Sequence, residues 1–440
     1  MATPFFKGGV HPEYRKELTA SLAITALPLP AQVVIPLQQH IGAPCEALVE
    51  VGDMVKAGQK IGESKGFVSA PVHASVSGKV IAVGPYNHPL GRKVEAVTIE
   101  SDGLDAWVEG LKPAGDLNSI TATELRSLIR EAGIVGMGGA TFPAHVKLAP
   151  PPEKPIDMVI INGAECEPYL TADHRLMLEK PGEIVFGLKV MMKALGASTG
   201  IIGIENNKPD ALRVMQQAVA GETDIRVVPL HTKYPQGAEK MLIQAISKRK
   251  VPSGGLPMDV GIVNHNVGTA VAMTRVVKEG KPLIERVVTV TGEGVVRPAN
   301  LLIRIGTLVS EVLEACGGLK DDTRKLIIGG PMMGLAQTTA DLPVIKGTSG
   351  ILALTAEDVA LFQSLPCIKC AKCVAVCPVS LVPTFIAQAS EHGMLQRADK
   401  LHAADCIECG CCSYICPSRI PLTQLIRLAK AEILEKRKQK

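Results

Sequence analysis

The alternation of hydrophobic and polar positions predicts a parallel α/β domain in the middle of the chain. Short runs of consecutive hydrophobic residues alternate there with segments whose hydrophobic residues recur at helical spacing. The expected strands are 157–161, 200–204 and 225–228, and the expected helices are 123–131, 183–195, 209–219 and 236–247. Strands separated by such helices imply a parallel sheet. Ligands of such a sheet bind at the loops that follow the carboxyl ends of its strands.

The N-terminal part has a different pattern, in which short alternating runs are joined by glycine turns. Residues 51–59 and 70–80 are typical of this pattern, which predicts short strands. The stretch resembles the barrel-sandwich hybrid of lipoyl and biotinyl carrier domains. Lys65 would be the carrier lysine, but its spacing to Gly78 does not match the carrier pattern. We therefore interpret Lys65 as a solvated lysine and expect a barrel-sandwich hybrid region over residues 1–110.

Residues 283–335 predict a small α+β module. Its expected strands are 285–291, 301–305 and 325–328, and its expected helix is 308–315. A tight loop, Gly-Gly-Pro-Met-Met-Gly at 329–334, closes the module.

The cysteines are concentrated in two short runs near the C-terminus. Of the 12 cysteines, only Cys45, Cys166 and Cys316 precede residue 367. The runs 367–378 and 406–417 both have the form C-x2-C-x2-C-x3-C-P, which is the bacterial ferredoxin pattern for [4Fe–4S] clusters. The alternative is a pair of structural zinc sites. Zinc sites take their thiolates in two pairs, so they do not explain the third and fourth cysteines that each run places before proline. The pattern predicts a ferredoxin-like domain with two clusters over residues 355–430.

The spacing also predicts which thiolates share a cluster. In such runs the first three cysteines bind one cluster and the fourth binds the other. The first expected set is Cys367, Cys370, Cys373 and Cys416, and the second is Cys406, Cys409, Cys412 and Cys377. Cys411 breaks the spacing that Cys412 keeps, so we expect Cys411 to bind no iron.

A glycine-rich segment at the start of the α/β domain has the features of a phosphate-binding loop. Gly136, Gly138 and Gly139 precede Pro143, and proline favours the first position of a helix. Glycines allow backbone N–H groups to approach an anion closely, and the N-terminus of the following helix favours negative charge. Lys147, one turn further on, adds a positive charge. By itself the pattern is equally typical of a plain turn.

Polar residues follow the strand that ends at Ile161. The segment from Asn162 to Tyr169 reads Asn-Gly-Ala-Glu-Cys-Glu-Pro-Tyr. Alternation places Glu165 and Glu167 on one side and Cys166 on the other. Carboxylates in this position accept hydrogen bonds from ribose hydroxyls or flavin N–H groups, and the alternative is an exposed acidic loop. Two further polar segments follow at 234–239 and 264–269.

These four segments resemble the flavin- and NADH-binding subunit of respiratory complex I. The motifs of that subunit are G-R-G-G-A-G-F-P, N-A-D-E-x-E-P, Y-x-x-G-E-E and N-N-V-E-T. This chain departs from them at Met137, Ala164, Ala238 and His265. The resemblance implies NAD(H) and a non-covalently bound FMN in a Rossmann-like domain over residues 120–280.

Over nearly its whole length, the chain is similar to the C subunit of the Rnf complex. The shared motifs are Gly8-Gly-Val-His-Pro12, the segments 161–169, 233–235 and 329–334, and both cysteine runs. The resemblance implies a peripheral subunit at the cytoplasmic face of the cell membrane. Its partners would be the membrane and ferredoxin-like subunits of a complex that couples electron transfer between ferredoxin and NAD⁺ to Na⁺ or H⁺ transport. It also implies a soluble-ligand-binding β-grasp module for residues 283–335.

The same resemblance implies a role for each residue of the site. The flavin phosphate is assigned to Gly136, Gly138, Gly139 and Lys147. The flavin is expected to contact Asn162, Glu165, Tyr234, Asn266 and Thr269, and the nicotinamide nucleotide is expected to face Phe142, Glu167 and Glu239. NADH gives up two electrons at once, whereas an iron–sulfur cluster accepts one, and a flavin mediates between them.

Composition and the distribution of charged residues argue against several classes of protein. A net charge of +4 and an aromatic content of 3% argue against a nucleic-acid-binding protein. The charge-free stretch 18–45 is interrupted by prolines, so no transmembrane segment is expected and ion transport falls to partners. No secretory signal is evident, which places the chain in the reducing cytoplasm. Residues 431–440 are expected to form a basic, solvated tail.

The sequence therefore predicts a multidomain α/β and α+β protein with three possible functions. The first is the Rnf-type electron-transfer role described above. The second is a cobalamin reductase of bacterial microcompartments, which shares this set of domains, although the opening Gly8 to Pro12 favours the first. The third is a scaffold with degenerate nucleotide sites, against which the intact cysteine runs argue.

Overall fold

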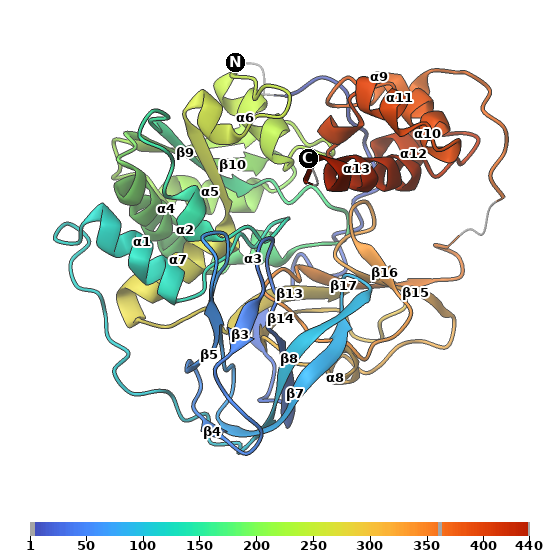
Figure 1. Ribbon diagram of the computed structural model, residues 1–440. Coiled ribbons are helices and arrows are strands. Elements are labelled where there is room, and N and C mark those ends of the chain that lie inside the picture. Colours follow the sequence, from blue (N-terminus) through green and yellow to red (C-terminus); the bar gives the residue numbers. More distant parts are fainter. Residues whose placement is uncertain (1–4, 360–362, 439–440) are drawn as a thin grey trace.

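The computed structural model describes residues 5–359 and 363–438, which form four domains (Figure 1). The α/β domain is built on a parallel sheet with the strand order β11-β10-β9-β12. These strands are β9 Met158–Gly163, β10 Thr199–Glu205, β11 Ile225–Leu230 and β12 Ile262–Asn266. Because all four run in the same direction, the loops that follow them meet at one edge of the sheet.

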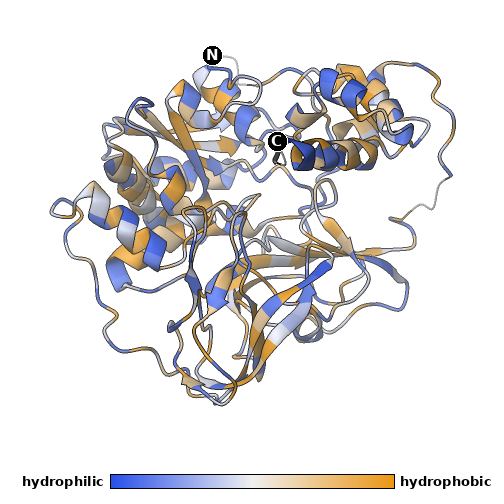
Figure 2. Ribbon diagram, viewed as in Figure 1, coloured by the Kyte–Doolittle hydropathy of each residue, from blue (hydrophilic) through white to orange (hydrophobic). Residues whose placement is uncertain are grey.

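Helices cover both faces of this sheet, as the alternating pattern predicts. They are α1 Ala122–Glu131, α2 Ala144–Lys147, α3 Ala172–Glu179, α4 Pro181–Leu195, α5 Pro209–Ala218, α6 Glu239–Ser247, the 3₁₀ helix η1 Pro257–Val260 and α7 Val267–Glu279. Helices α1, α4, α5 and α7 pack on the face that carries Val159 and Ile161. Helix α6 packs on the opposite face, against Ile160 and Ile201. Figure 2 shows the hydrophobic strands enclosed between these helices.

Strand β12 and helix α7 are elements that the hydrophobic pattern did not predict. Strand β12 is fully buried although three of its five residues are Asn264, His265 and Asn266, so it lacks a hydrophobic run. Helix α7 is buried around most of its circumference, so its sequence has no polar face from which helical spacing can be recognised.

The N-terminal β domain consists of two sheets, which agrees with the expected barrel-sandwich hybrid. Its strands are β2 Gln32–Pro36, β3 Cys45–Ala47, β4 Met54–Val55, β5 Lys60–Ser64, β6 Val72–His73, β7 Gly78–His88 and β8 Arg92–Ser101. One sheet has the order β2-β8-β7-β4, the other β3-β5-β6, and Val33, Ile61 and Val97 belong to the core between them. The exposed Lys65 forms an ion pair with Glu46.

The β-grasp domain is a six-stranded mixed sheet with the order β1-β14-β13-β17-β15-β16. Its elements are β1 Ile24–Ala26, β13 Glu285–Thr291, β14 Ala299–Arg304, α8 Val309–Ala315, β15 Thr323–Ile328, β16 Leu335–Gln337 and β17 Gly350–Thr355. Strands β1 and β17 lie outside the expected range 283–335. Strand β17 pairs with both β13 and β15, so the sheet is incomplete without it.

The cysteine-rich domain is a small helical unit (Figure 1, orange to red). Its helices are α9 Lys372–Ala375, α10 Pro383–Glu391, α11 Leu395–Lys400, the 3₁₀ helix η2 Ala403–Asp405, α12 Cys411–Ile415 and α13 Leu422–Lys438. Residues 431–438, expected to form a separate tail, continue α13, because Ala429 and Ile433 are buried in the core of this domain. Residues 439–440 lie outside the described residues. No helix in the described ranges is both long and apolar enough to cross a membrane.

The contact between α4 and α7 provides a test of the fold. A Cβ atom on Gly187 of α4 would lie 2.1 Å from the carbonyl oxygen of Ala270 in α7. We expect Gly187→Ala to lower the free energy of unfolding by ~1–3 kcal/mol, because the helices must separate. In the same helix, a Cβ on Gly182 would meet nothing within 4 Å. Gly182→Ala should therefore leave stability unchanged or raise it, and equal urea midpoints for the two variants would contradict this packing.

Candidate cofactor sites

The carboxyl edge of the parallel sheet brings together the polar segments that follow its strands. Asn162 at the end of β9 pairs in register with Asn266 at the end of β12. Asn162 Nδ2 donates to the carbonyl of Gly237 (2.8 Å), which attaches the segment 234–239 to this edge. Asn266 Oδ1 accepts from Gly268 N (2.8 Å) and caps helix α7. Three of the four polar segments therefore meet here.

The glycine-rich loop lies over the same edge and leaves two donors free. Gly136 N donates to Phe142 O (2.9 Å), and Met137 N donates to Thr269 Oγ1 (3.0 Å). Among the described residues, the N–H groups of Gly138 and Gly139 find no protein acceptor. A Cβ on Gly138 would lie 2.8 Å from Asn266 Nδ2. The loop is thus a cradle that requires glycine, and its free N–H groups fit the phosphate of a flavin nucleotide.

Two residues expected to serve different ligands meet in an ion pair. Lys147 Nζ lies 2.7 Å from Glu239 Oε1 and also donates to the carbonyl of Asn264 (2.9 Å). The ammonium group therefore contacts strand β12 and pairs with Glu239, and its contact with a flavin phosphate stays a prediction.

Glu165 caps a helix that the sequence did not predict. Its carboxylate accepts from Asp173 N (2.8 Å) and His174 N (3.1 Å) at the start of α3. Burial and the charge of Glu165 raise the pKa of Asp173 to about 7, and Asp173 Oδ2 accepts from Asn266 Nδ2 (2.6 Å). Glu165 thus reaches the flavin cradle through Asp173 and Asn266.

Glu165 and Glu167 do not point the same way, contrary to the prediction from alternation. The backbone of Glu165 is in the left-handed region, with a φ of 43°, so the chain turns instead of continuing as a strand. Glu167 accepts from Met332 N (3.0 Å) and Met333 N (2.9 Å) in the loop 329–334 of the β-grasp domain. Burial raises the pKa of Glu167 to about 7.

Tyr234 connects the α/β domain with the cysteine-rich domain. Its hydroxyl donates to the carbonyl of Cys409 (2.8 Å) and lies 3.4 Å from Glu167 Oε1. Its backbone pairs with Val10, whose neighbour Gly9 donates to the carbonyl of Val376 (2.8 Å). The opening Gly-Gly-Val segment is therefore enclosed between the two domains, which explains a motif that the sequence alone left without a role.

Two buried side chains at this edge have polar atoms without a protein partner. Among the described residues, both amide atoms of Gln236 and Nε2 of His265 are buried and form no hydrogen bond. Burial keeps the pKa of His265 well below its usual value, so its ring is neutral. Both residues belong to polar segments seen in the sequence but received no role there, because only the structure shows that their polar atoms are unpaired.

In the cysteine-rich domain, thiols of the two cysteine runs lie close to one another, while the division into two ligand sets stays a prediction. A small cavity is lined by Cys377 of the first run together with Cys406, Cys409, Cys411 and Cys412 of the second. In the other set, burial raises the pKa of Cys373, and the neighbouring thiols of Cys416 and Cys367 raise it further. The fourth cysteine of each run thus lies with the other run.

Backbone N–H groups point at several of these sulfur atoms, as they do around iron–sulfur clusters. Lys369 N lies 3.4 Å from Cys367 Sγ, Leu381 N lies 3.3 Å from Cys377 Sγ, and Glu408 N lies 3.4 Å from Cys406 Sγ. In the described ranges, no three His, Cys, Asp or Glu side chains converge as the ligands of a single metal ion would. The donor set and these contacts fit two [4Fe–4S] clusters.

Four domains of this kind, with a flavin cradle beside a pair of thiolate sets, define a flavin- and iron–sulfur-containing electron-transfer protein. Comparison with known families supports each part. The Nuo51 FMN-binding domain matches residues 129–275, and the RnfC barrel sandwich hybrid domain matches residues 5–104. The SLBB domain matches residues 287–336, and a 4Fe-4S dicluster domain matches residues 361–417.

Similarity over the whole length then identifies the family. The chain is 51% identical over 433 residues to the C subunit of the Na(+)-translocating ferredoxin:NAD(+) oxidoreductase complex of Acetobacterium woodii, covering 98% of each chain. It is 50% identical over 428 residues to the C subunit of the proton-translocating complex of Clostridium ljungdahlii, covering 97% of this chain and 93% of the relative. It is 45% identical over 439 residues to the C subunit of the ion-translocating oxidoreductase complex of Rhodobacter capsulatus, covering 99% of this chain and 84% of the relative. The chain belongs to the family of C subunits of Rnf-type ferredoxin:NAD⁺ oxidoreductase complexes, which carry FMN and [4Fe–4S] clusters.

The glycine cradle can be tested by filling it. Gly138→Ala places a methyl group against Asn266, so the loop must move away from the edge of the sheet. We expect the FMN content of the purified protein to fall several-fold, measured as flavin released by acid precipitation. Gly221→Ala is the matched control, because a Cβ there meets nothing within 4 Å. Full flavin occupancy in Gly138→Ala would show that the loop does not hold the nucleotide.

The cysteine assignment predicts different iron contents for two variants. Cys370→Ser should lower the bound iron, because the ligand spacing assigns Cys370 to the first set. Cys411→Ala should retain all eight irons of two [4Fe–4S] clusters, because Cys411 is buried beside the carbonyl of Tyr234 (4.0 Å) and does not keep the ligand spacing. Iron analysis and the visible absorbance of the clusters are the measurements. Loss of a cluster from Cys411→Ala but not from Cys412→Ala would reverse the assignment.

Proposed function

We propose that this chain is the NAD(H)-reactive subunit of an Rnf-type complex and passes electrons between NAD(H) and two [4Fe–4S] clusters through FMN. The observation that carries this proposal is the hydrogen bond from Tyr234 to Cys409, which joins the candidate flavin site directly to a candidate cluster ligand. FMN supplies the exchange between a two-electron hydride donor and one-electron carriers. The chain itself binds, orients and insulates these groups.

Each part of the cradle has a defined task in this proposal. The free N–H groups of Gly138 and Gly139 bind the flavin phosphate, while Gly136 shapes the loop through its bond to Phe142. Lys147 balances the phosphate charge and is shared with Glu239. Asn162, Asn266 and Thr269 hold the edge on which the flavin rests. Phe142 and Glu239 face the entering nicotinamide nucleotide.

In this proposal the carboxylates of Glu165 and Glu167 bind backbone N–H groups of neighbouring segments rather than the cofactors. Glu165 fixes the start of α3 and, through Asp173, the position of Asn266. Glu167 holds the loop 329–334 against Tyr234. Both are therefore positioning residues, a revision of the direct flavin and nucleotide contacts expected from the sequence.

The burial of the cysteines supports an order for the two clusters. Cys409 and Cys412 are buried, and Cys409 adjoins Tyr234, so the second set is the one nearer the flavin. Cys370 of the first set is exposed, with exposed Leu365 and Ile368 beside it in the sequence. The first cluster is thus the one that exchanges electrons with a neighbouring protein of the complex.

Ion transport belongs to other subunits in this proposal. The two relatives of nearly equal identity are named for different ions, Na⁺ in one and protons in the other, so likeness to them favours neither ion. We place the chain at the cytoplasmic face of the membrane, bound to the membrane and ferredoxin-like subunits. Reconstituted transfer from reduced ferredoxin to NAD⁺, with and without this chain, tests the activity. Undiminished transfer in its absence would refute the proposal.

The link through Tyr234 gives a sharper test within the chain. Tyr234→Phe removes the hydroxyl that donates to Cys409 but keeps the ring. We expect unchanged FMN and iron, NADH oxidation with a small-molecule dye at nearly the original rate, and a several-fold slower reduction of the clusters by NADH, followed by stopped-flow absorbance. Tyr414→Phe, which alters a half-exposed tyrosine in α12, is the control. Equal cluster reduction in both variants would remove Tyr234 from the path.

A further inference from the structure

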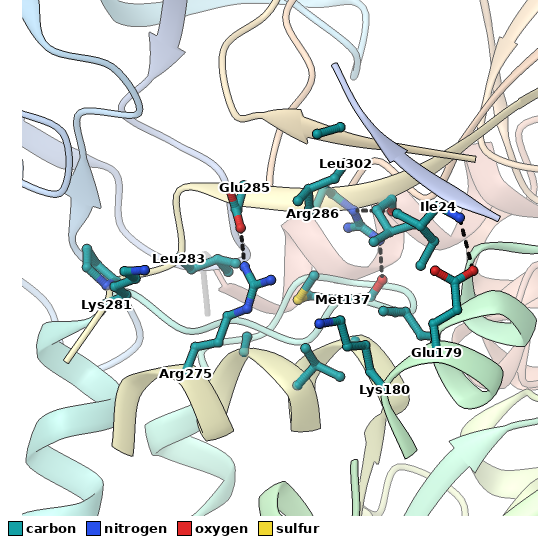
Figure 3. Close-up of a pocket in the computed structure, with 17 residues that line it drawn as sticks. Ile24, Met137, Glu179, Lys180, Arg275, Lys281, Leu283, Glu285, Arg286 and Leu302 are labelled. Carbon is teal, nitrogen blue, oxygen red and sulfur yellow. Dashed lines mark hydrogen bonds and ion pairs between the residues drawn. The ribbon is translucent and has the colours of Figure 1, made fainter. Parts of the chain in front are cut away.

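A cavity of about 350 Å³ lies between the α/β domain and the β-grasp domain (Figure 3). Helices α3 and α7 form one side, and strands β1, β13 and β14 form the other. Its wall is mostly apolar and includes Ile24, Met137, Leu176, Val271, Leu283 and Leu302. Its volume falls within the range of pockets that bind small molecules. None of the residues assigned above to FMN or NAD(H) lines it.

Arg286 brings a positive charge without an ion-pair partner into this wall. The residue is 4% exposed, and its guanidinium donates to three backbone carbonyls. These are Lys346 O, Met137 O (3.2 Å) and Val287 O (3.4 Å). Among the described residues no carboxylate forms an ion pair with it. Burial lowers the pKa of Arg286 to about 10, against the opposing effect of the more distant Asp173, which leaves the group charged at neutral pH.

Only some of the guanidinium N–H groups of Arg286 form hydrogen bonds. A guanidinium has five N–H donors, and three are directed at the carbonyls just named. Two remain, on a buried cation that no carboxylate contacts. A buried charge without a partner is strongly unfavourable. A carboxylate can accept charge-assisted hydrogen bonds from two guanidinium N–H groups.

The other charged groups around the cavity already have partners. Arg275 pairs with Glu285, Lys180 with Glu183 (3.1 Å) and Lys281 with Glu279 (2.8 Å). Glu179 accepts from Ile24 N (3.0 Å) and pairs with Arg175 (2.8 Å). Figure 3 shows Arg275 and Lys180 on the helix side and Arg286 close to Met137. Arg286 is therefore the cation in this wall that a ligand would neutralise.

We propose that this cavity binds a small organic acid with an apolar body, whose carboxylate pairs with Arg286. A neutral apolar molecule would leave the guanidinium without a counter-ion. Inorganic phosphate would leave most of its oxygens against apolar side chains without donors. The acid would lie against Met137 of the glycine loop and Gly268 of α7, next to the flavin cradle but outside it. This site does not depend on the proposed electron path.

Calorimetric titration of the cofactor-loaded full chain with octanoate tests the proposal. We expect saturable binding of one octanoate per chain, with octan-1-ol at least ~10-fold weaker because it cannot form the charge-assisted pair. Arg286→Met should abolish this preference, and Arg286→Lys should retain part of it. Arg297→Met, which changes an exposed arginine outside the cavity, should bind octanoate like the unchanged protein.

A second variant keeps the test decisive if Arg286→Met fails to fold. Ala272→Phe adds a ring to the wall of the cavity and leaves Arg286 in place, so it should weaken octanoate binding at least ~10-fold, a change of about 1.4 kcal/mol. Three results would overturn the proposal: equal affinities for octanoate and octan-1-ol, unchanged octanoate binding in Ala272→Phe, or no binding of either octanoate or the more compact phenylacetate.

Discussion

Two buried cations of the β-grasp domain hold the glycine loop in place. Lys346 Nζ donates to the carbonyl of Gly133 (2.7 Å) at the start of the loop and to that of Pro71 (2.8 Å) in the N-terminal β domain. Arg286 donates to the carbonyl of Met137 within the loop. Lys346 is buried, and this burial lowers the pKa of its ammonium group to about 8. The position of the flavin cradle thus depends on three domains at once.

Buried lysines also donate to backbone carbonyls of the loop that follows β9. Lys16 Nζ donates to the carbonyls of Glu165 (2.8 Å) and Glu167 (3.0 Å), and Lys208 Nζ donates to that of Ala164 (2.7 Å). A loop that turns its N–H groups toward a ligand turns carbonyls toward the protein interior, and buried carbonyls need donors. Lysine and arginine reach these carbonyls from distant elements, so the loops are held without regular secondary structure.

The contact between the α/β domain and the cysteine-rich domain is buried and largely apolar. Tyr234, Cys166, Cys409 and Cys411 are all buried in one apolar cluster with Val10. Gly237 N donates to Cys166 Sγ (3.2 Å), which ties the junction to the edge of the sheet. This cluster excludes water from the contact between the two domains. In the proposed electron path, the exposed Cys370 lies at the far end, where the first cluster would meet a partner.

The sequence by itself determined the kinds and order of the four domains and the chemistry of the clusters, because periodicity and ligand spacing are local properties of the chain. It also located the glycine loop and the polar segments after β9 and β12. It did not place strands β1 and β17 in the β-grasp sheet, because they join it from distant parts of the chain. It did not show that Lys147 pairs with Glu239, that Glu165 caps α3, or that Glu167 binds the loop 329–334. These pairings join residues from separate elements, so only the packed structure decides them. The same holds for Arg286, since its unused donors become visible only when every neighbour of the buried guanidinium is in place.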